Sequence, residues 1–224
     1  MQINENLIKY NFSSRKNTPI KYIVIHDTGN TGYKADANAH YNYFNTGDRQ
    51  ASAHYFVDDK QILRVVKDSN KSWHCGDGLG KYGITNENSI GIEICINKDG
   101  DYNKAVGNTL YLVKYLMNNY NIGIDNVVRH YDASRKCCPN TMSQNNWLKW
   151  TEFKNKLKSI TNDNNTNSDP NYYTTYIINL YYKLLNRQPD PSGLSYWKNR
   201  IKNNCDLGQF VIELFNSDEY KKIN

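Results

Sequence analysis

The chain has 224 residues, of which 38% are hydrophobic and 22% charged, and its formal net charge is +6. This balance is typical of a globular protein, and the length suits one enzyme-sized domain with a small appendage. No run approaches the roughly 18 apolar residues that a membrane span needs, and the opening MQINENLIKY lacks the features of a secretory signal. We therefore expect synthesis in the cytoplasm and no membrane insertion.

The net charge indicates which kind of partner the protein could bind, and the cysteine count indicates the state of its thiols. A basic protein favours an anionic partner, but the basic residues are scattered and resemble no nucleic-acid module, so no nucleic acid is expected. Five cysteines are an odd count in a chain without a signal peptide, which argues for reduced thiols, some of them available to a metal. Cys75, Cys95 and Cys205 are expected to be buried small residues.

The first part of the chain predicts short strands and one helix. YIVIH at 22–26 is a β-branched run that stops at a turn, and residues 36–44 have helical character. AHYFV and QILRVV flank the turn-forming Asp58, Asp59 and Lys60, which indicates a hairpin. A further strand is expected at SIGIEICI, residues 89–96.

The next part alternates helix and strand. Apolar residues recur at three- and four-residue steps between 103 and 120, which predicts an amphipathic helix. A short strand, NVVRH, ends at His130, and a last helix follows Pro139. This alternation predicts an α/β fold with a central mixed β-sheet flanked by helices.

The composition changes sharply near residue 160. TNDNNTNSDPN at 161–171 breaks all periodicity and is interpreted as a linker, while YYTTYIINLYYKLLNR and the residues after it predict short helices. We therefore divide the chain into a catalytic domain, 1–160, a linker, 161–171, and a small all-α domain, 172–224.

Three residues at or after strand ends are suited to zinc. His26 ends the first predicted strand, His130 ends NVVRH, and Cys138 follows in a loop before Pro139. Two imidazoles and a thiolate leave one tetrahedral position for water, as in catalytic zinc sites. Each residue taken alone is better explained as an ordinary strand-end histidine or a buried cysteine.

The motifs YIVIHDTG, SAHYFVD, SWHCG, IGIEI and VVRHYDASRKCCP occur in this order. Together they resemble the type 2 N-acetylmuramoyl-L-alanine amidases, the zinc family that includes many phage endolysins and autolysins and shares its fold with peptidoglycan-recognition proteins. The likeness covers about residues 15–158. It implies Zn²⁺ held by His26, His130 and Cys138, with Cys137 not a ligand, and peptidoglycan as substrate.

The resemblance also implies two catalytic residues. Glu93 lies within an apolar strand pattern, where an acid requires a polar site or a partner, and its family counterpart is a general base. Lys136 matches a lysine that stabilises the tetrahedral oxyanion; a solvated loop lysine is its alternative. Some relatives place a tyrosine just before the position of His54, but Ala53 stands there, so Glu93 must contribute more.

Substrate contacts are predicted from residues that border the groove in this family. Trp73 and His74 are assigned to substrate binding, and His54 is either groove lining or a structural histidine. Asp27 and Asp132 are explained equally well as turn-forming residues or as partners of the ligand imidazoles.

Residues 172–224 resemble a small helical domain of unknown function, for which we expect wall-polymer binding; a stabilising or dimerising appendage is nearly as well supported. A lytic amidase of endolysin or autolysin type, released to the wall by a holin pore or by lysis, fits a chain without a signal. A non-catalytic peptidoglycan-binding module and a cytoplasmic muropeptide-recycling amidase are the alternatives. No feature of the sequence indicates an oligomeric state.

Overall fold

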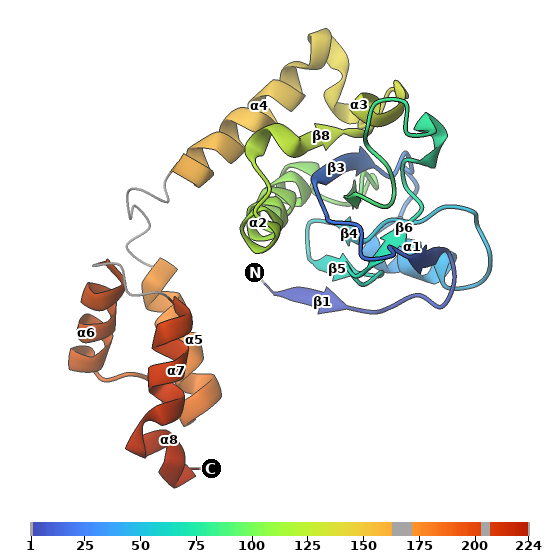
Figure 1. Ribbon diagram of the computed structural model, residues 1–224. Coiled ribbons are helices and arrows are strands. Elements are labelled where there is room, and N and C mark those ends of the chain that lie inside the picture. The colour runs from blue at the N-terminus through green and yellow to red at the C-terminus, as the bar shows by residue number, and fades with distance from the viewer. Residues whose placement is uncertain (1, 163–171, 203–206, 224) are drawn as a thin grey trace. The chain divides into compact units, whose positions relative to one another are not determined.

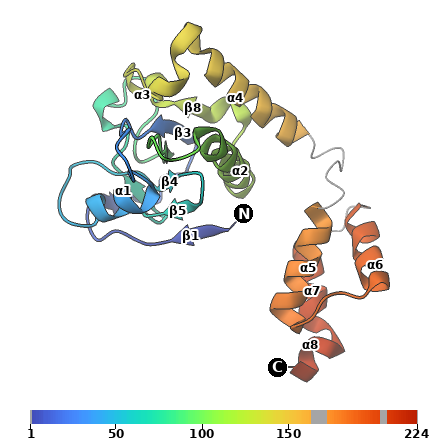
Figure 2. The same ribbon diagram turned by 180° about the vertical axis from the view of Figure 1, so that it is seen from behind.

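The computed structural model describes residues 2–162, 172–202 and 207–223 (Figures 1 and 2). The chain divides into two compact units, Met1–Thr161 and Asn162–Asn224. The first two residues of the predicted linker continue a helix, and residues 163–171 lie outside the described part, as does Cys205. None of the described helices is both long and apolar enough to cross a membrane.

A six-stranded sheet forms the centre of the first unit, in the order β1, β5, β4, β7, β3, β8. Neighbouring strands are parallel except β4 and β5, which pair antiparallel as the predicted hairpin. The mixed sheet predicted from the sequence is confirmed. The strands are β1 (Ile3–Glu5), β3 (Tyr22–Asp27), β4 (Tyr55–Val57), β5 (Ile62–Arg64), β7 (Ser89–Ile94) and β8 (Val127–Arg129).

Three strands were not expected from the sequence. They are β1 and the antiparallel pair of β2 (Phe12–Ser14) with β6 (Asn70–Ser72). Each has three residues and mixed or polar composition, so it shows no local alternation and is defined by its partner strand.

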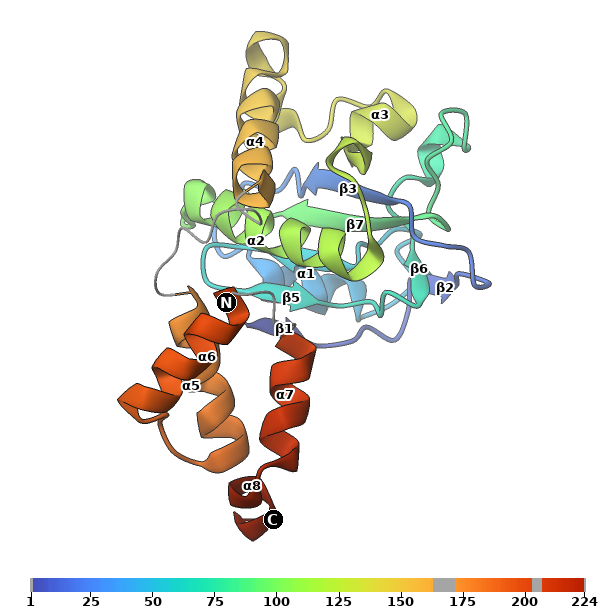
Figure 3. The same cartoon turned by 60° about the vertical axis from the view of Figure 1, so that its left-hand side comes forward.

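Helices cover both faces of the sheet, as Figure 3 shows for α2 and α1. Asp36 caps α1 by accepting from the Ala39 N–H, and Asp101 caps α2 in the same way through Lys104. The described helices of this unit are α1 (Ala37–Phe44), η1 (Gly76–Gly78), α2 (Tyr102–Tyr120), η2 (Ile124–Asn126), α3 (His130–Ser134), η3 (Asn140–Met142) and α4 (Gln144–Asn162), whose residues 145–147 depart from helical geometry.

The two sheet faces differ because successive strand residues point to opposite sides. Ile90, Ile92 and Ile94 of β7 join the main core with residues of α2 and α4. On the opposite side, Phe56 and Leu63 pack with Ala37 of α1 in a second cluster. The intervening β7 residues Ser89, Gly91 and Glu93 therefore lie on the side away from the main core.

The second unit contains α5 (Tyr172–Leu185), α6 (Pro191–Lys202), α7 (Leu207–Asn216) and α8 (Asp218–Ile223). It has its own hydrophobic core, in which the Trp197 and Phe210 ring centroids are 4.2 Å apart. Asp190 accepts a hydrogen bond from the Gly193 N–H at the start of α6, as expected for a helix cap.

Candidate metal centre and active site

Three predicted ligands converge at one edge of the sheet. His26 lies near the carboxyl end of β3, and His130 directly follows the parallel neighbour strand β8. Cys138 returns to this edge from the loop after α3, with its Sγ 3.8 Å from His26 Nδ1. All three side chains are buried, and their ligand atoms lie within 4.8 Å of one another. This geometry can hold a metal ion.

The protonation of the two imidazoles suits a cation. Burial lowers the pKa of His26 well below its usual value, and His130 and His74 nearby lower it further. Burial also lowers the pKa of His130, although Asp77 opposes the shift. Both imidazoles are therefore neutral near pH 7, as metal ligands must be.

The surroundings of Cys138 shift the pKa of its thiol in opposite directions. Burial and the nearby Glu93 raise the pKa of Cys138, whereas a hydrogen bond from the Asp27 backbone N–H and the charge of Lys136 lower it. A buried thiolate without a cation is unfavourable, so the Cys138 sulfur would need a positive ion beside it to ionise.

Glu93 stands beside His26 because β3 and β7 are paired in register, with His26 opposite Glu93. Its Oε1 lies 3.8 Å from His26 Nδ1, and its buried Oε2 has no hydrogen-bond partner. Burial, together with the nearby Asp27, raises the pKa of Glu93 to about 8. An unpaired buried carboxyl oxygen beside three ligand atoms fits a site that takes a metal, water and a polar substrate.

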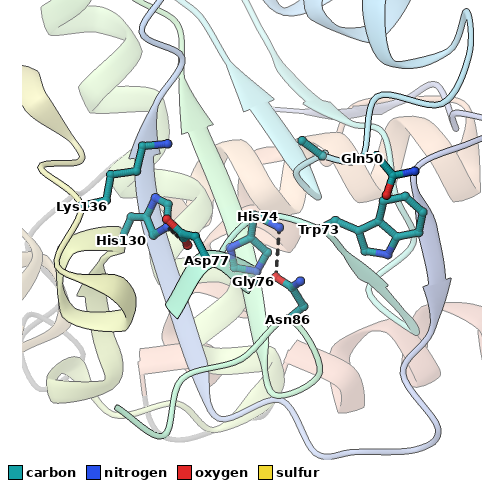
Figure 4. A pocket seen from close by; sticks show the side chains of 9 residues that line it. Gln50, Trp73, His74, Gly76, Asp77, Asn86, His130 and Lys136 are labelled. Atoms are coloured by element: carbon teal, nitrogen blue, oxygen red, sulfur yellow. Dashed lines mark hydrogen bonds and ion pairs between the residues drawn. The ribbon is translucent and has the colours of Figure 1, made fainter. Parts of the chain in front are cut away.

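Lys136 and the cysteine pair line the same cavity as the ligands. Lys136 also borders an adjoining hollow with Gln50, Trp73, Asp77 and Asn86, and Figure 4 shows this group around His130 and His74. Cys137 is exposed, and its thiol donates to Asn140 Oδ1. Of the two adjacent cysteines, Cys138 is the one whose sulfur faces His26.

A carboxylate that was not singled out in the sequence, Asp77, contacts the imidazole of His130, one of the predicted ligands. His130 Nε2 donates to Asp77 Oδ1 at 2.8 Å, across 53 residues. Asp27 instead accepts from the backbone N–H and hydroxyl of Thr141, and Asp132 accepts from Arg129 at the start of α3. Asp77 lies in η1, a Gly-flanked turn whose only sequence signal is an acid soon after the SWHCG motif.

The three predicted substrate-binding residues lie in different environments. Trp73 lines both cavities and donates from Nε1 to Ser13 Oγ. His74 is 8% exposed, and its ring nitrogens contact His26 and Ser89.

His54 is fully buried, with Gly91 N–H donating to its Nδ1 and Arg15 Nη2 lying 3.0 Å from its Nε2. Of the two alternatives for His54, the structural histidine fits this position and groove lining does not.

A mixed α/β sheet with two buried histidines, a buried cysteine and an adjacent carboxyl at one edge is suited to a protein that binds a metal ion. Residues 16–141 match the family described as N-acetylmuramoyl-L-alanine amidase, Amidase_2, which is more than half of the chain. The chain belongs to this family. Residues 145–224 match a second family, described as a domain of unknown function, DUF4214.

Individual proteins that are similar to this chain carry the same family description. N-acetylmuramoyl-L-alanine amidase XlyA of Bacillus subtilis is 43% identical over 137 residues, which are 61% of this chain and 43% of that protein. CwlH of the same organism is 38% identical over 138 residues, 62% of this chain and 53% of that protein. The solved catalytic domain of XlyA superposes with a TM-score of 0.63 at 38% identity, covering 70% of this chain and 99% of that domain. The chain thus spans about half the length of the curated relatives it matches.

Proposed function

We propose that this protein is a zinc-dependent N-acetylmuramoyl-L-alanine amidase of the endolysin or autolysin type. It would hydrolyse the amide between N-acetylmuramic acid and L-alanine in bacterial peptidoglycan. The observation that supports this most strongly is the buried set of His26, His130 and Cys138 beside the unpaired carboxyl of Glu93. The curated relatives are named for this activity.

His26, His130 and Cys138 are the residues that would hold Zn²⁺. When bound there, zinc supplies a Lewis acid that polarises a carbonyl and lowers the pKa of water. Neutral imidazoles and a sulfur donor match its ligand preferences.

In this proposal Glu93 moves the proton. A pKa of about 8 keeps the Glu93 carboxyl close to the balance point near neutral pH, and a cation beside it would move that pKa downward. The carboxylate takes a proton from the attacking water and returns it to the leaving amine nitrogen, so the C–N bond breaks with a neutral amine as product.

Lys136 and Trp73 act on the substrate. Lys136 lines both hollows beside His130, where its cationic head stabilises the negative charge that develops on the carbonyl oxygen. Trp73 offers an aromatic surface for sugar or peptide at the opposite wall.

Analysis of digested peptidoglycan tests this function. Mass spectrometry should find free L-alanine amino termini with intact glycan strands, and a chelator should stop the reaction until zinc is restored. New reducing sugars would instead identify a glycosidase, and chelator-resistant lysis would contradict the metal.

The second unit is proposed to bind a polymer of the wall. Its separate core supports an independent role, and exposed aromatic residues such as Tyr182 and Tyr196 offer contact surface for sugars. Deleting residues 162–224 should leave hydrolysis of soluble muropeptides intact and weaken sedimentation with intact walls. Unchanged wall binding would reject the role.

A further inference from the structure

The ring of His74 packs directly against the sheet beneath the metal site. It lies over Gly91 of β7, where an added Cβ would sit 2.5 Å from the ring Cγ and 2.7 Å from Nδ1. Only glycine leaves room for the imidazole at this position. His74 Nδ1 thereby reaches within 3.0 Å of His26 Nε2.

Hydrogen bonds connect Ser89 to His74 and His74 to His26. Their directions can be assigned by starting from Ser89. The Ser89 hydroxyl donates to the carbonyl oxygen of Thr85 at 2.5 Å, which uses its single proton. Ser89 Oγ must then accept from His74 Nε2–H, which lies 3.0 Å away. His74 Nδ1 is consequently the unprotonated nitrogen of a neutral ring.

The protonation of His74 also fixes which nitrogen of His26, the proposed metal ligand, carries a hydrogen. Because His74 Nδ1 is an acceptor, His26 Nε2 carries the hydrogen that it receives. His74 is buried and its ring nitrogens contact uncharged groups, which favours the neutral ring, and an imidazole that binds a metal through one nitrogen carries a single ring hydrogen. The lone pair of His26 is then on Nδ1, the atom 3.8 Å from both Cys138 Sγ and Glu93 Oε1.

We propose that Ser89 and His74 are positioning residues that hold His26 in its Nε2–H tautomer and so present the Nδ1 lone pair to the metal. This inference rests on the proposed function, because the tautomer matters only where an ion binds His26. It gives His74 a role different from direct substrate contact, since both of its ring nitrogens are engaged within the protein.

The two ligand histidines are thus oriented by unlike partners. His130 donates to Asp77, a carboxylate whose side chain is 46% exposed, whereas His26 donates to a buried neutral imidazole. Cys75 borders the buried side, with Sγ 4.0 Å from His74 Nε2. Burial raises the pKa of Cys75 to about 12, so its thiol stays neutral and does not compete for a proton from this chain.

The proposed hydrogen-bond chain from Ser89 through His74 to His26 can be tested by measuring zinc affinity in a matched pair of full-length variants. Asn and Leu have the same branched shape, but only Asn offers an oxygen near the position of Nδ1. We expect His74→Leu to weaken zinc binding by roughly 10- to 100-fold in a chelator competition titration, the range for lost outer partners of metal ligands. His74→Asn should recover most of that affinity. Equal losses of zinc affinity in the two variants would overturn the proposed positioning role of His74.

Two further measurements keep the test decisive if His74→Leu does not fold. Ser89→Ala removes the acceptor that sets the His74 tautomer, and it should weaken zinc binding measurably; unchanged affinity would contradict the proposal. In the zinc-loaded wild type, imidazole ¹⁵N and ¹³C shifts should show His26 bound through Nδ1, and Nε2 ligation would overturn it. A wild-type protein that fails to bind zinc would instead reject the proposed function itself.

Discussion

The two faces of β7 serve different purposes although they belong to one strand. Ile90, Ile92 and Ile94 point into the main core, while Ser89, Gly91 and Glu93 lie on the side of the candidate metal site. The apolar face stabilises the fold through burial, whereas the other face contains a buried unpaired carboxyl oxygen that contributes no such stability. Neighbouring residues of β7 therefore have different roles: those on the core face stabilise the fold, and those on the other face are available for binding and catalysis.

The largest effect is expected where the site loses a ligand. Cys138→Ser should abolish stoichiometric zinc binding and wall lysis, because the sulfur that faces His26 is removed. Cys137→Ser is the matched control, and it should keep both properties since Cys137 is exposed and contacts Asn140. Metal analysis and a turbidity assay measure the difference. Equal losses from the two changes would show that the ligand is wrongly chosen.

Next in size is a change on the site face of β7. Glu93→Gln keeps the shape of the side chain but cannot take a proton, so turnover should fall by roughly 10²- to 10⁴-fold. Zinc content should be unchanged, and the free energy of unfolding should not decrease, because the change alters a carboxyl group whose Oε2 is buried without a hydrogen-bond partner. Wild-type turnover would exclude Glu93 from the reaction, and a large loss of stability would break the contrast between the two faces.

The adjacent residue on the core face should give the opposite result. Ile92 is fully buried, so Ile92→Ala should lower the free energy of unfolding by about 2–5 kcal/mol, as other large-to-small core changes do. Turnover per folded molecule should stay close to that of the wild type. Chemical denaturation and the lytic assay, run on both β7 variants, give the direct comparison. Loss of turnover without loss of stability in Ile92→Ala would contradict it.

The smallest effect concerns acid stability. Burial beside the Arg15 guanidinium lowers the pKa of His54 to about 3, below the ordinary 6.5 of the unfolded chain. His54 therefore contributes stability that is complete above pH 6.5 and declines by up to about 1.4 kcal/mol per pH unit as the pH falls toward 3.

The variant His54→Gln cannot titrate in this range. Its stability should be lower at neutral pH and should depend less on pH, so the two unfolding curves should approach each other in acid. Urea midpoints measured from pH 7 to pH 4 test this. Parallel pH profiles would show that His54 does not titrate as its surroundings require.

Local pattern predicted much of this fold because the largest elements bury a regular face. The apolar spacing of α2 and the β-branched runs of β3 and β7 are visible within a few residues, and all three appear where expected. The short strands β1, β2 and β6 were missed because three residues contain no readable period. Their structure depends on partners as distant as Ile62 for Ile3.

The sequence by itself determined which chemical groups were available: two imidazoles, adjacent thiols, and an acid within an apolar strand. Tertiary structure decided how those groups meet, because the contacts join distant residues, such as His26 with His74 and His130 with Asp77. It also decided that Cys138 faces the histidines and that His54 is enclosed. Identity and periodicity are properties of a segment, whereas hydrogen-bond direction and burial belong to surroundings that only the folded chain assembles.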